Sequence, residues 1–452
     1  MARPRNIVVL IADSLRDDAC HGPDGNAGLP FVAAHGTRFT QARASGCWTL
    51  PATASMFTGL MPHEHGADSQ TRGVRPEVPT LAEKLREHGY RTRQVTANIA
   101  TTEIFGLDRG FDEVVRIWKH VPDRYNRFHE AMVLMGKPRL RKKLFSPEYI
   151  TGKLASDLEA SKVWLQDTVD DIFDHARRIL AEDERAGKGS FLFLNLMETH
   201  FPYHVGPEFE FVADGPIGRL REMRALYHLV NQTWVMSGQQ PIRHDMMRLL
   251  RERQRRAWLR LAPKVDSFVA ELRARDGNLV VFGADHGDCF GEQGWAYHFS
   301  NVADGGNRVP LYWLRHDHDA ARTVDVPISA RDLFRGVLHE VGDPAGETHP
   351  ADEPERSFPV MQSCWYNNQG RTLPEYRYNQ ICFVEAGQRW MHRRGEWYSA
   401  PPAGPCGEPS FVRLPKGTNP LHELPVAPER RAALQSIHAD FETFSARVGH
   451  GA

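Results

Sequence analysis

The sequence contains little cysteine, no long apolar run and no excess of either charge. Its six cysteines are scattered over 452 residues without a Cys-x-x-Cys pair, which favours free thiols in a reducing compartment over a disulfide framework. No apolar run approaches the roughly 20 residues of a membrane-spanning helix, and the first run, residues 7–12, is too short for a signal peptide. The 56 basic and 57 acidic side chains nearly cancel, so net charge provides no general attraction to nucleic acid. We therefore expect a cytoplasmic protein with no membrane span and no nucleic-acid partner.

Several short apolar runs alternate with helical patterns along most of the chain. They occupy residues 7–12, 91–98, 191–196, 279–282 and 310–314. Fully apolar strands that alternate with helices predict an α/β fold, with a large, mostly parallel sheet sandwiched by helices. A length of 452 residues also exceeds what one compact core usually holds.

A segment rich in proline, glycine and charge, residues 344–350, is predicted to be a linker. We predict a main domain over residues 1–343 and a small C-terminal α+β subdomain over residues 358–452, with an antiparallel sheet and a closing helix. Two stretches break the alternation of strand and helix, at about residues 118–157 and 209–260. Both are predicted to be helical insertions, and insertions in such folds often cap the functional site.

Polar side chains gather where the predicted strands end. Asp13 follows the first apolar run, Glu198 and His200 follow the third, and Asp285 and His286 follow the fourth. In parallel sheets reactive groups collect at the carboxyl ends of the strands. Buried carboxylates are costly unless their charge is compensated, so this arrangement predicts a bound metal ion.

One motif defines the chemistry of the predicted site. It reads Trp48-Thr-Leu-Pro-Ala-Thr-Ala-Ser-Met-Phe-Thr-Gly59 and resembles the nucleophile signature of sulfatases in the alkaline phosphatase/sulfatase superfamily. There, Cys or Ser, any residue, Pro, any residue and Arg lead into a helix ending in Thr-Gly. This register places Thr49 at the nucleophile and Thr53 at the Arg, whereas Cys47 lies two residues too early. Threonine cannot become the formylglycine of sulfatases, so the resemblance implies an unmodified hydroxyl nucleophile, as in the superfamily's phosphatases and phosphodiesterases.

The same resemblance implies a metal site made of Asp13, Thr49, Asp285 and His286. Asp13 begins the sequence Asp-Ser-Leu-Arg, similar to the family's first metal-binding block, and Asp285 and His286 match its Ser-Asp-His-Gly-Glu block. Two carboxylates, one imidazole and one hydroxyl suit a single Zn²⁺ or Mn²⁺. Ca²⁺ stays open, although it prefers more oxygen ligands and Ser14 replaces the family's second aspartate. Binding to a divalent cation lowers the pKa of a hydroxyl and activates it as a nucleophile.

Three further residues match positions that hold the transferring group. His200 lies in a block similar to Asp-Pro-His-x-Pro-Tyr, and His298 precedes Arg-Val-Pro as a histidine does in relatives. Either histidine is expected to bind ester oxygens or to protonate the leaving alkoxide, with His298 favoured as the acid. Asn98 stands where sulfatases have a substrate lysine, so it binds a phosphoryl oxygen or caps the next helix. The second metal of alkaline phosphatases requires Asp-x-x-x-His, but Pro202 stands at the histidine position, so one metal ion is expected.

Loss of the family's Arg and Lys reduces the positive charge around the bound anion. We therefore expect a hydrolase or transferase of phosphoesters, with diesters favoured, that forms a covalent phospho-threonine at Thr49. Two alternatives stay open: hydrolysis of sulfate or phosphonate esters at the same site, and a non-catalytic binding protein. The substrate is expected to be a small-molecule, glycan-type or lipid-type anionic ester, and no motif identifies it or the oligomeric state.

Overall fold

The computed structural model describes residues 3–447 except for residues 23–24, 26, 69–72, 118–167, 207–209, 231–242, 276, 293–294, 299–300, 318–319, 354–359, 364–378, 386, 394, 402–410, 424 and 426. The insertion predicted over residues 118–157 lies outside the described residues. Within them, no helix combines the length and the apolar character that a membrane crossing requires.

Eight strands form the central sheet in the order β11-β2-β10-β7-β1-β6-β4-β5. Their bounds are β1 (Asn6–Ala12), β2 (Thr37–Phe39), β4 (Arg91–Thr96), β5 (Glu113–Arg116), β6 (Ser190–Leu196), β7 (Asn278–Gly283), β10 (Leu311–Leu314) and β11 (Arg322–Val324). All neighbouring strands are parallel except β10, which runs antiparallel to β7 and β2. The predicted mostly parallel sheet is confirmed, and every apolar run proposed from the sequence supplies one of its strands.

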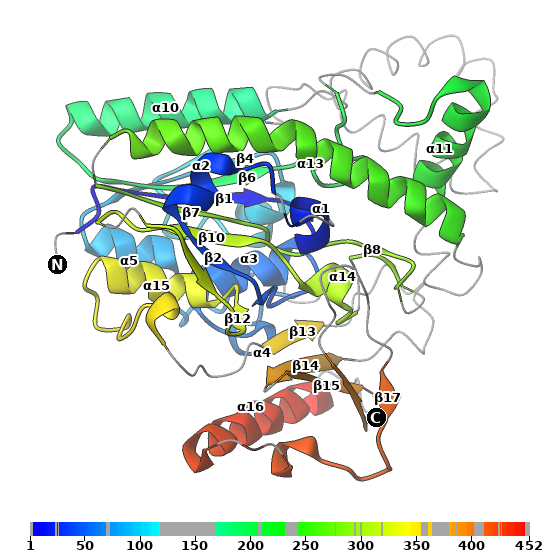
Figure 1. The fold of residues 1–452 in the computed structure, drawn as a ribbon. Coiled ribbons are helices and arrows are strands. Elements are labelled where there is room, and N and C mark those ends of the chain that lie inside the picture. The colour runs from blue at the N-terminus through cyan, green and yellow to red at the C-terminus, as the bar shows by residue number, and fades with distance from the viewer. Residues whose placement is uncertain are drawn as a thin grey trace.

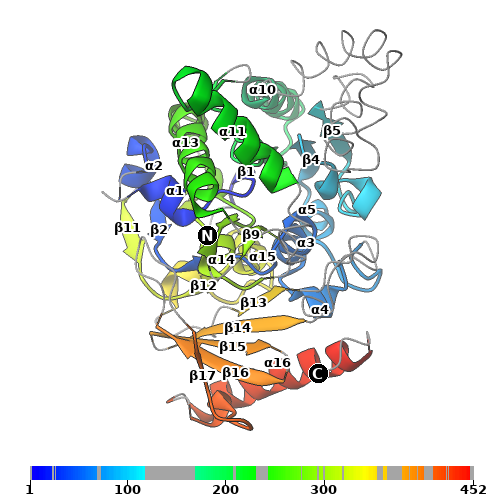
Figure 2. The same cartoon turned by 90° about the vertical axis from the view of Figure 1, so that its right-hand side faces the viewer.

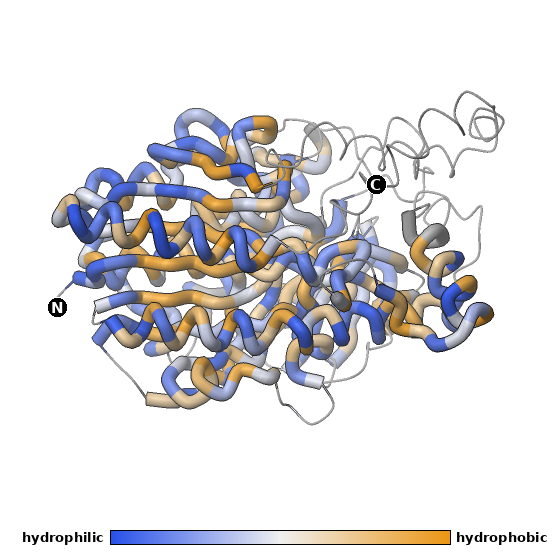
Figure 3. Tube along the Cα trace, turned by 90° about the horizontal axis from the view of Figure 1, so that it is seen from above, coloured by the Kyte–Doolittle hydropathy of each residue, from blue (hydrophilic) through white to orange (hydrophobic). Residues whose placement is uncertain are grey.

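Helices cover both faces of this sheet (Figure 1). On one face lie α2 (Pro30–His35), α10 (Val169–Arg185) and α13 (His244–Arg273), and on the other α3 (Thr49–Thr58), α5 (Leu81–Glu87) and α15 (Asp332–Glu340). Because both faces are covered, all seven residues of β1 are buried. Hydrophobic residues run along the strands, whereas hydrophilic and hydrophobic residues alternate along the covering helices (Figure 3), as expected of amphipathic helices.

Helix α13 connects the second predicted insertion to the core. Its N-terminal half packs against α11 (Gly215–Val230), and both lie largely within the predicted insertion at residues 209–260. Its C-terminal half covers the sheet, with Trp258, Val265 and Phe268 buried in the main hydrophobic core. The described parts of the segment are largely helical, and α13 forms part of the layered fold; that the segment caps the site stays a prediction.

The C-terminal part forms a five-stranded antiparallel sheet with one helix (Figures 1 and 2). The strands are β13 (Val360–Ser363), β14 (Gln380–Glu385), β15 (Gln388–Arg393), β16 (Glu396–Ala400) and β17 (Val412–Arg413), and the helix is α16 (Pro428–Arg447). Alternating residues face opposite sides of the sheet. Cys382 and Met391 join the core of the main domain, whereas Ile381, Phe383 and Trp397 pack in a separate cluster with residues of α16. The predicted strand-rich C-terminal part is thereby confirmed.

Short elements complete the described chain. They are α1 (Asp17–His21), α4 (Pro62–His65), α14 (Asp304–Asn307), β3 (Ala42–Arg43), β8 (Cys289–Phe290), β9 (Ala296–Tyr297), β12 (Ile328–Ser329) and the 3-10 turns η1 (Ile99–Thr101), η2 (Glu103–Phe105), η5 (Pro350–Asp352) and η7 (Pro420–His422). Strands β8 and β9 form a small hairpin close to the site, and β3 pairs with β12.

A buried carboxylate ties the end of α10 to the sheet. Asp183 accepts hydrogen bonds from Arg91 (3.0 Å), Ser190 (2.5 Å) and Arg93. Burial works to raise the pKa of Asp183, but these hydrogen bonds, with that from Arg93 the strongest, bring the pKa below its ordinary value. The ionised form of Asp183 therefore stabilises the folded chain.

Replacing Asp183 with alanine is expected to lower the free energy of unfolding by about 2–3 kcal/mol at pH 7, because charged donors lose their acceptor. The Asp183 carboxyl titrates at a lower pH in the folded than in the unfolded chain. Its stabilising contribution is therefore complete above about pH 4 and is lost as the pH falls through the folded pKa. Urea unfolding between pH 7 and pH 3 is expected to show the difference between wild type and D183A narrowing at the acid end. A difference that stayed constant over this range would contradict the role of Asp183.

Candidate functional site

The predicted site residues meet at the carboxyl edge of the central sheet. Asp13 follows β1, Asn98 follows β4, His200 follows β6, and Asp285 and His286 follow β7. Because β1, β4, β6 and β7 are parallel, their carboxyl ends share one edge. The topology therefore places these side chains at one edge of the sheet, and their functional roles stay predictions.

Three buried side chains, Asp13, Asp285 and His286, form a group with the geometry of a metal site, called the metal-type group below. The ligand atoms of Asp13, Asp285 and His286 all lie within 4.8 Å of one another. His286 Nε2 is 3.7 Å from Asp13 Oδ1, 3.5 Å from Asp285 Oδ2 and 3.3 Å from Thr49 Oγ1. The other nitrogen of His286, Nδ1, is hydrogen-bonded to the Gly287 carbonyl at 3.1 Å, so Nε2 is the nitrogen whose lone pair faces the three oxygens.

The charges of this group call for a cation. Burial raises the pKa of Asp285 well above its ordinary value, and the negative charge of Asp13 raises it further. Burial also works to raise the pKa of Asp13, but His200, His286 and hydrogen bonds from two asparagines bring it below its ordinary value. Asp285 Oδ2 has no hydrogen-bond partner among the described residues. Two buried carboxylates with an unsatisfied oxygen, beside an imidazole lone pair, fit a divalent cation.

The backbone around Ser14 arranges both carboxylates. Ser14 has a φ of 61°, a left-handed conformation that is uncommon for serine. In this conformation its N–H donates to Asp285 Oδ1 (3.2 Å) and its Oγ donates to Asp13 Oδ1 (3.1 Å). Gln254 of α13 donates to the Ser14 carbonyl (2.8 Å) and to the Thr199 carbonyl (3.1 Å). Helix α13 thus holds two of the strand-end loops in place.

Thr49 is the first residue of α3 and its side chain points to the same group. The position places its hydroxyl beside the N-terminal backbone N–H groups of the helix, which favour an anion. Asn98 Nδ2 donates to Thr49 Oγ1 (3.2 Å) and to Asp13 Oδ2 (2.7 Å), while Asn98 Oδ1 accepts from Ala100 N–H (2.8 Å). Asn98 therefore caps η1 and its amide also reaches the site, whereas binding of a phosphoryl oxygen stays a prediction.

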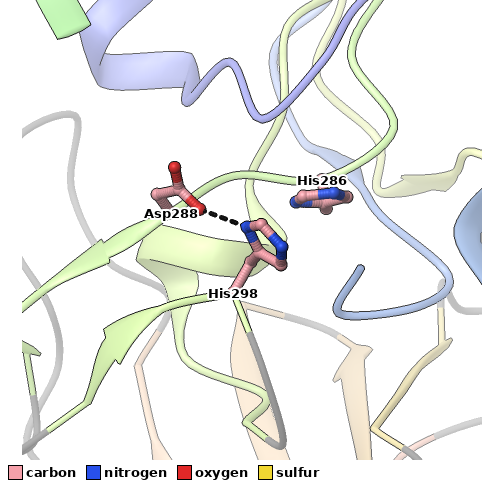
Figure 4. A group of neighbouring side chains, drawn as sticks. All are labelled: His286, Asp288 and His298. Carbon is pink, nitrogen blue, oxygen red and sulfur yellow. Dashed lines mark hydrogen bonds and ion pairs between the residues drawn. The ribbon is translucent and has the colours of Figure 1, made fainter. Parts of the chain in front are cut away.

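His298 lies beside the metal-type group and is held by residues that the sequence analysis missed. His298 Nδ1 is 2.6 Å from Asp288 Oδ1, and Tyr203 donates its hydroxyl to Asp288 Oδ2 (2.8 Å). Figure 4 shows His298 between Asp288 and His286, whose ring centroid is 4.4 Å from that of His298. Burial raises the pKa of Asp288 to about 6. Burial and the neighbouring His286 and His200 hold the pKa of His298 well below its ordinary value.

His200 is the outermost of the three histidines. It is partly exposed, its ring centroid is 5.3 Å from that of His298, and its Nε2 is hydrogen-bonded to the hydroxyl of Tyr297 (3.1 Å). The hairpin residue Tyr297 therefore positions His200, and it adopts a left-handed φ of 69° to do so. The three histidines form a row from the buried metal-type group toward the surface.

The ligand atoms of His286, Asp288 and His298 also lie within 4.8 Å of one another. The separation of 2.6 Å between His298 Nδ1 and Asp288 Oδ1 is that of a hydrogen bond, and His286 Nδ1 already faces a carbonyl. A second ion would have to share His286 Nε2 with the first. We therefore interpret this group as a hydrogen-bonded aspartate–histidine pair.

The mostly parallel sheet with its helical layers has the fold of the alkaline phosphatase superfamily. The family model "Sulfatase" matches residues 5–342. The chain therefore belongs to the sulfatase family, a family of hydrolases that use a divalent metal ion.

Individual relatives are distant. Arylsulfatase K of Canis lupus familiaris is 31% identical over 93 residues, which cover 20% of this chain and 17% of that protein. The phosphonate monoester hydrolase of Agrobacterium radiobacter has a TM-score of 0.58 at 15% identity, covering 98% of this chain and 96% of that one. The lipoteichoic acid synthase LtaP of Listeria monocytogenes has a TM-score of 0.56 at 11% identity, covering 99% and 93%. At these identities the structural likeness shows a shared fold.

Proposed function

We propose that this protein cleaves phosphoesters, diesters in particular, with Thr49 as a metal-activated nucleophile. The proposal is supported mainly by one observation: Thr49 Oγ1 and one oxygen each of the buried Asp13 and Asp285 carboxylates lie 3.3–3.7 Å from His286 Nε2. A divalent cation held by Asp13, Asp285 and His286, for which Zn²⁺ or Mn²⁺ fits the ligand set best, would lower the pKa of the Thr49 hydroxyl and neutralise charge on the ester.

The chain's own residues account for the first chemical step. The Thr49 hydroxyl gives up its proton to water, Oγ1 attacks phosphorus and forms the Oγ1–phosphorus bond, and the bond from phosphorus to the leaving oxygen breaks. The N-terminal N–H groups of α3 hold the oxygens of the ester next to Thr49, and the Asn98 N–H that donates to Thr49 Oγ1 in the free protein would turn to an ester oxygen. Water, or an acceptor alcohol, then attacks the phospho-threonine and releases Thr49.

Protonation of the leaving alkoxide is assigned to His298, with Asp288 as its positioning residue. Asp288 accepts from His298 Nδ1 and thereby directs the other ring nitrogen toward the site. In the free protein burial disfavours the protonated imidazole, and an anionic ester bound next to it would favour that form again. His200, farther out, is assigned to binding the ester oxygens.

The substrate class follows from charge. Thr53 and Asn98 occupy the positions at which the family carries Arg and Lys. The site therefore offers less positive charge, which suits a monoanionic diester better than a dianionic monoester. Sulfate and phosphonate esters are the alternative, favoured by the names of the arylsulfatase and the phosphonate monoester hydrolase to which this chain is similar. Each of these esters also carries a single negative charge.

A panel of aryl esters with one leaving group tests the choice. Purified protein loaded with Zn²⁺ or Mn²⁺ is assayed with p-nitrophenyl sulfate, phosphate, phenyl phosphonate and a phosphodiester, and kcat/KM is compared. The highest value is expected for the phosphodiester, and a clear preference for the sulfate or phosphonate would establish the alternative. Absence of turnover with all four esters, together with absence of bound metal, would favour a binding protein.

Asp288→Asn is expected to lower kcat about 100-fold or more for an ester with an alkyl leaving group, because the amide cannot stabilise the His298 imidazolium. The loss is expected to shrink to a few-fold with p-nitrophenol, which leaves without protonation. Tyr203→Phe, which removes one hydrogen bond to Asp288, serves as the milder control. If kcat fell equally for both leaving groups, the Asp288–His298 pair would have a structural role and no role as an acid.

A further inference from the structure

A second cluster of metal-ligand side chains lies in the C-terminal part of the chain. His392 belongs to β15, and His438 and Glu442 belong to α16, one helical turn apart. The ligand atoms of the three side chains lie within 4.8 Å of one another. None of the three takes part in the proposed reaction, so the cluster requires a separate explanation.

The fold brings these residues together from two elements. His392 is paired with Ile381 and Trp397 on neighbouring strands, and these two residues belong to the cluster that packs against α16. The His392 and His438 ring centroids are 5.1 Å apart, and His438 Nε2 is 3.6 Å from Glu442 Oε1. The cluster therefore sits where the helix meets the sheet.

The two imidazoles of this cluster are available to coordinate a metal ion. The side chain of His438 is only 9% exposed, and its Nε2 makes no hydrogen bond within the part of the chain that the structure describes. Burial lowers the pKa of His392 and of His438 to about 4, so both imidazoles are neutral at pH 7 and each keeps a lone pair. A buried polar atom without a partner costs about 1–3 kcal/mol, and a coordinated cation would remove this cost.

We propose that His392, His438 and Glu442 bind one divalent transition-metal ion, with Zn²⁺ as the best match. Two imidazoles and one carboxylate are an established zinc ligand set, and water completes the tetrahedron. The ion joins β15 to α16. A hydrogen bond from Asn379 Nδ2 to Ser445 Oγ (3.1 Å) makes a further contact close to the C-terminal end of α16. The site is structural, since it clamps a helix onto a sheet that carries no residue of the proposed mechanism.

Zinc titration of the full-length protein tests this site separately from the catalytic one. The His286→Ala variant, which lacks a ligand of the catalytic group, is stripped with a chelator and titrated with Zn²⁺ by calorimetry. One equivalent is expected to bind and to raise Tm. Adding Glu442→Gln is expected to weaken Zn²⁺ binding more than about tenfold, and adding His438→Gln is expected to abolish binding.

The matched control is His422→Gln, because His422 is an exposed histidine near the same helix. This change is expected to leave the Zn²⁺ affinity of the His286→Ala protein unchanged. The Glu442 side chain is 56% exposed, so Glu442→Gln keeps the fold and remains informative if the His438 variant does not fold. The proposal is overturned if the His286→Ala protein binds no Zn²⁺, or if Glu442→Gln and His422→Gln have the same affinity.

Discussion

Replacing Thr49 with alanine is expected to reduce kcat by about 10³-fold or more, because a covalent step loses its nucleophile. The variant keeps Asp13, Asp285 and His286, three of the four proposed metal ligands, so it is expected to retain its metal with reduced affinity. The measurement is steady-state turnover of the best ester in the panel, combined with metal analysis. In the wild type, acid quenching during turnover is also expected to trap a phosphorylated peptide that contains Thr49.

Two control variants make the Thr49 result specific. Thr49→Ser keeps a hydroxyl at the first position of α3 and is expected to retain measurable turnover and a trapped phosphopeptide. Thr53→Ala lies one helical turn farther along α3, where the buried Thr53 hydroxyl has no hydrogen-bond partner among the described residues. It is expected to stay within a few-fold of wild type. If Thr49→Ala kept full turnover, covalent catalysis at this residue would be wrong.

The sheet could be predicted because a strand buried on both faces leaves a continuous apolar run. Residues 191–196 and β6 (Ser190–Leu196) show this directly. The direction of β10 could not be predicted, since an apolar run of four residues is the same for a parallel and an antiparallel strand. Arg253 illustrates a second limit: it lies in an arginine-rich stretch that favours a solvated surface, yet it is buried against Glu222 of α11. The ion pair with Glu222 and hydrogen bonds to the carbonyls of Pro202 and Glu210 compensate the buried charge of Arg253.

The metal-type group could be predicted because its members are close to strand ends, and parallel strands place those ends together. The Asp288–His298 pair carried a usable signal, since Asp288 lies two residues after His286 in the same block. Tyr203 ends the block that contains His200, but its contact with Asp288 could not be predicted, because it joins residues 85 positions apart. The left-handed conformation of Ser14 could not be predicted either, because serine seldom adopts it and the hydrogen bond to Asp285 that accompanies it joins distant parts of the chain.

Asp285→Asn is expected to abolish metal binding and turnover while making the metal-free protein more stable. In the metal-free chain Asp285 Oδ1 accepts from Ser14 N–H and His286 N–H, whereas Oδ2 has no hydrogen-bond partner among the described residues. An asparagine would keep the accepting oxygen and place an amide donor where Oδ2 stands, 3.5 Å from His286 Nε2. Removing an unsatisfied buried acceptor and a repelling negative charge is expected to raise the free energy of unfolding by about 1–2 kcal/mol, measured by urea unfolding at pH 7 with a chelator present.

Asp13→Asn is the matched control, because the two carboxylates differ in how the protein supports them. Asp13 Oδ2 already accepts from the amides of Asn98 (2.7 Å) and Asn195 (3.2 Å), so its negative charge is stabilised without a metal. The amide in its place is expected to lower the stability of the metal-free protein by about 1 kcal/mol, although turnover is lost in the same way. Opposite stability changes with equal loss of activity would identify Asp285 as the carboxylate that is maintained for metal binding at the expense of folding. If Asp285→Asn also destabilised the metal-free protein, the unpaired oxygen of Asp285 would not be the source of strain in the site.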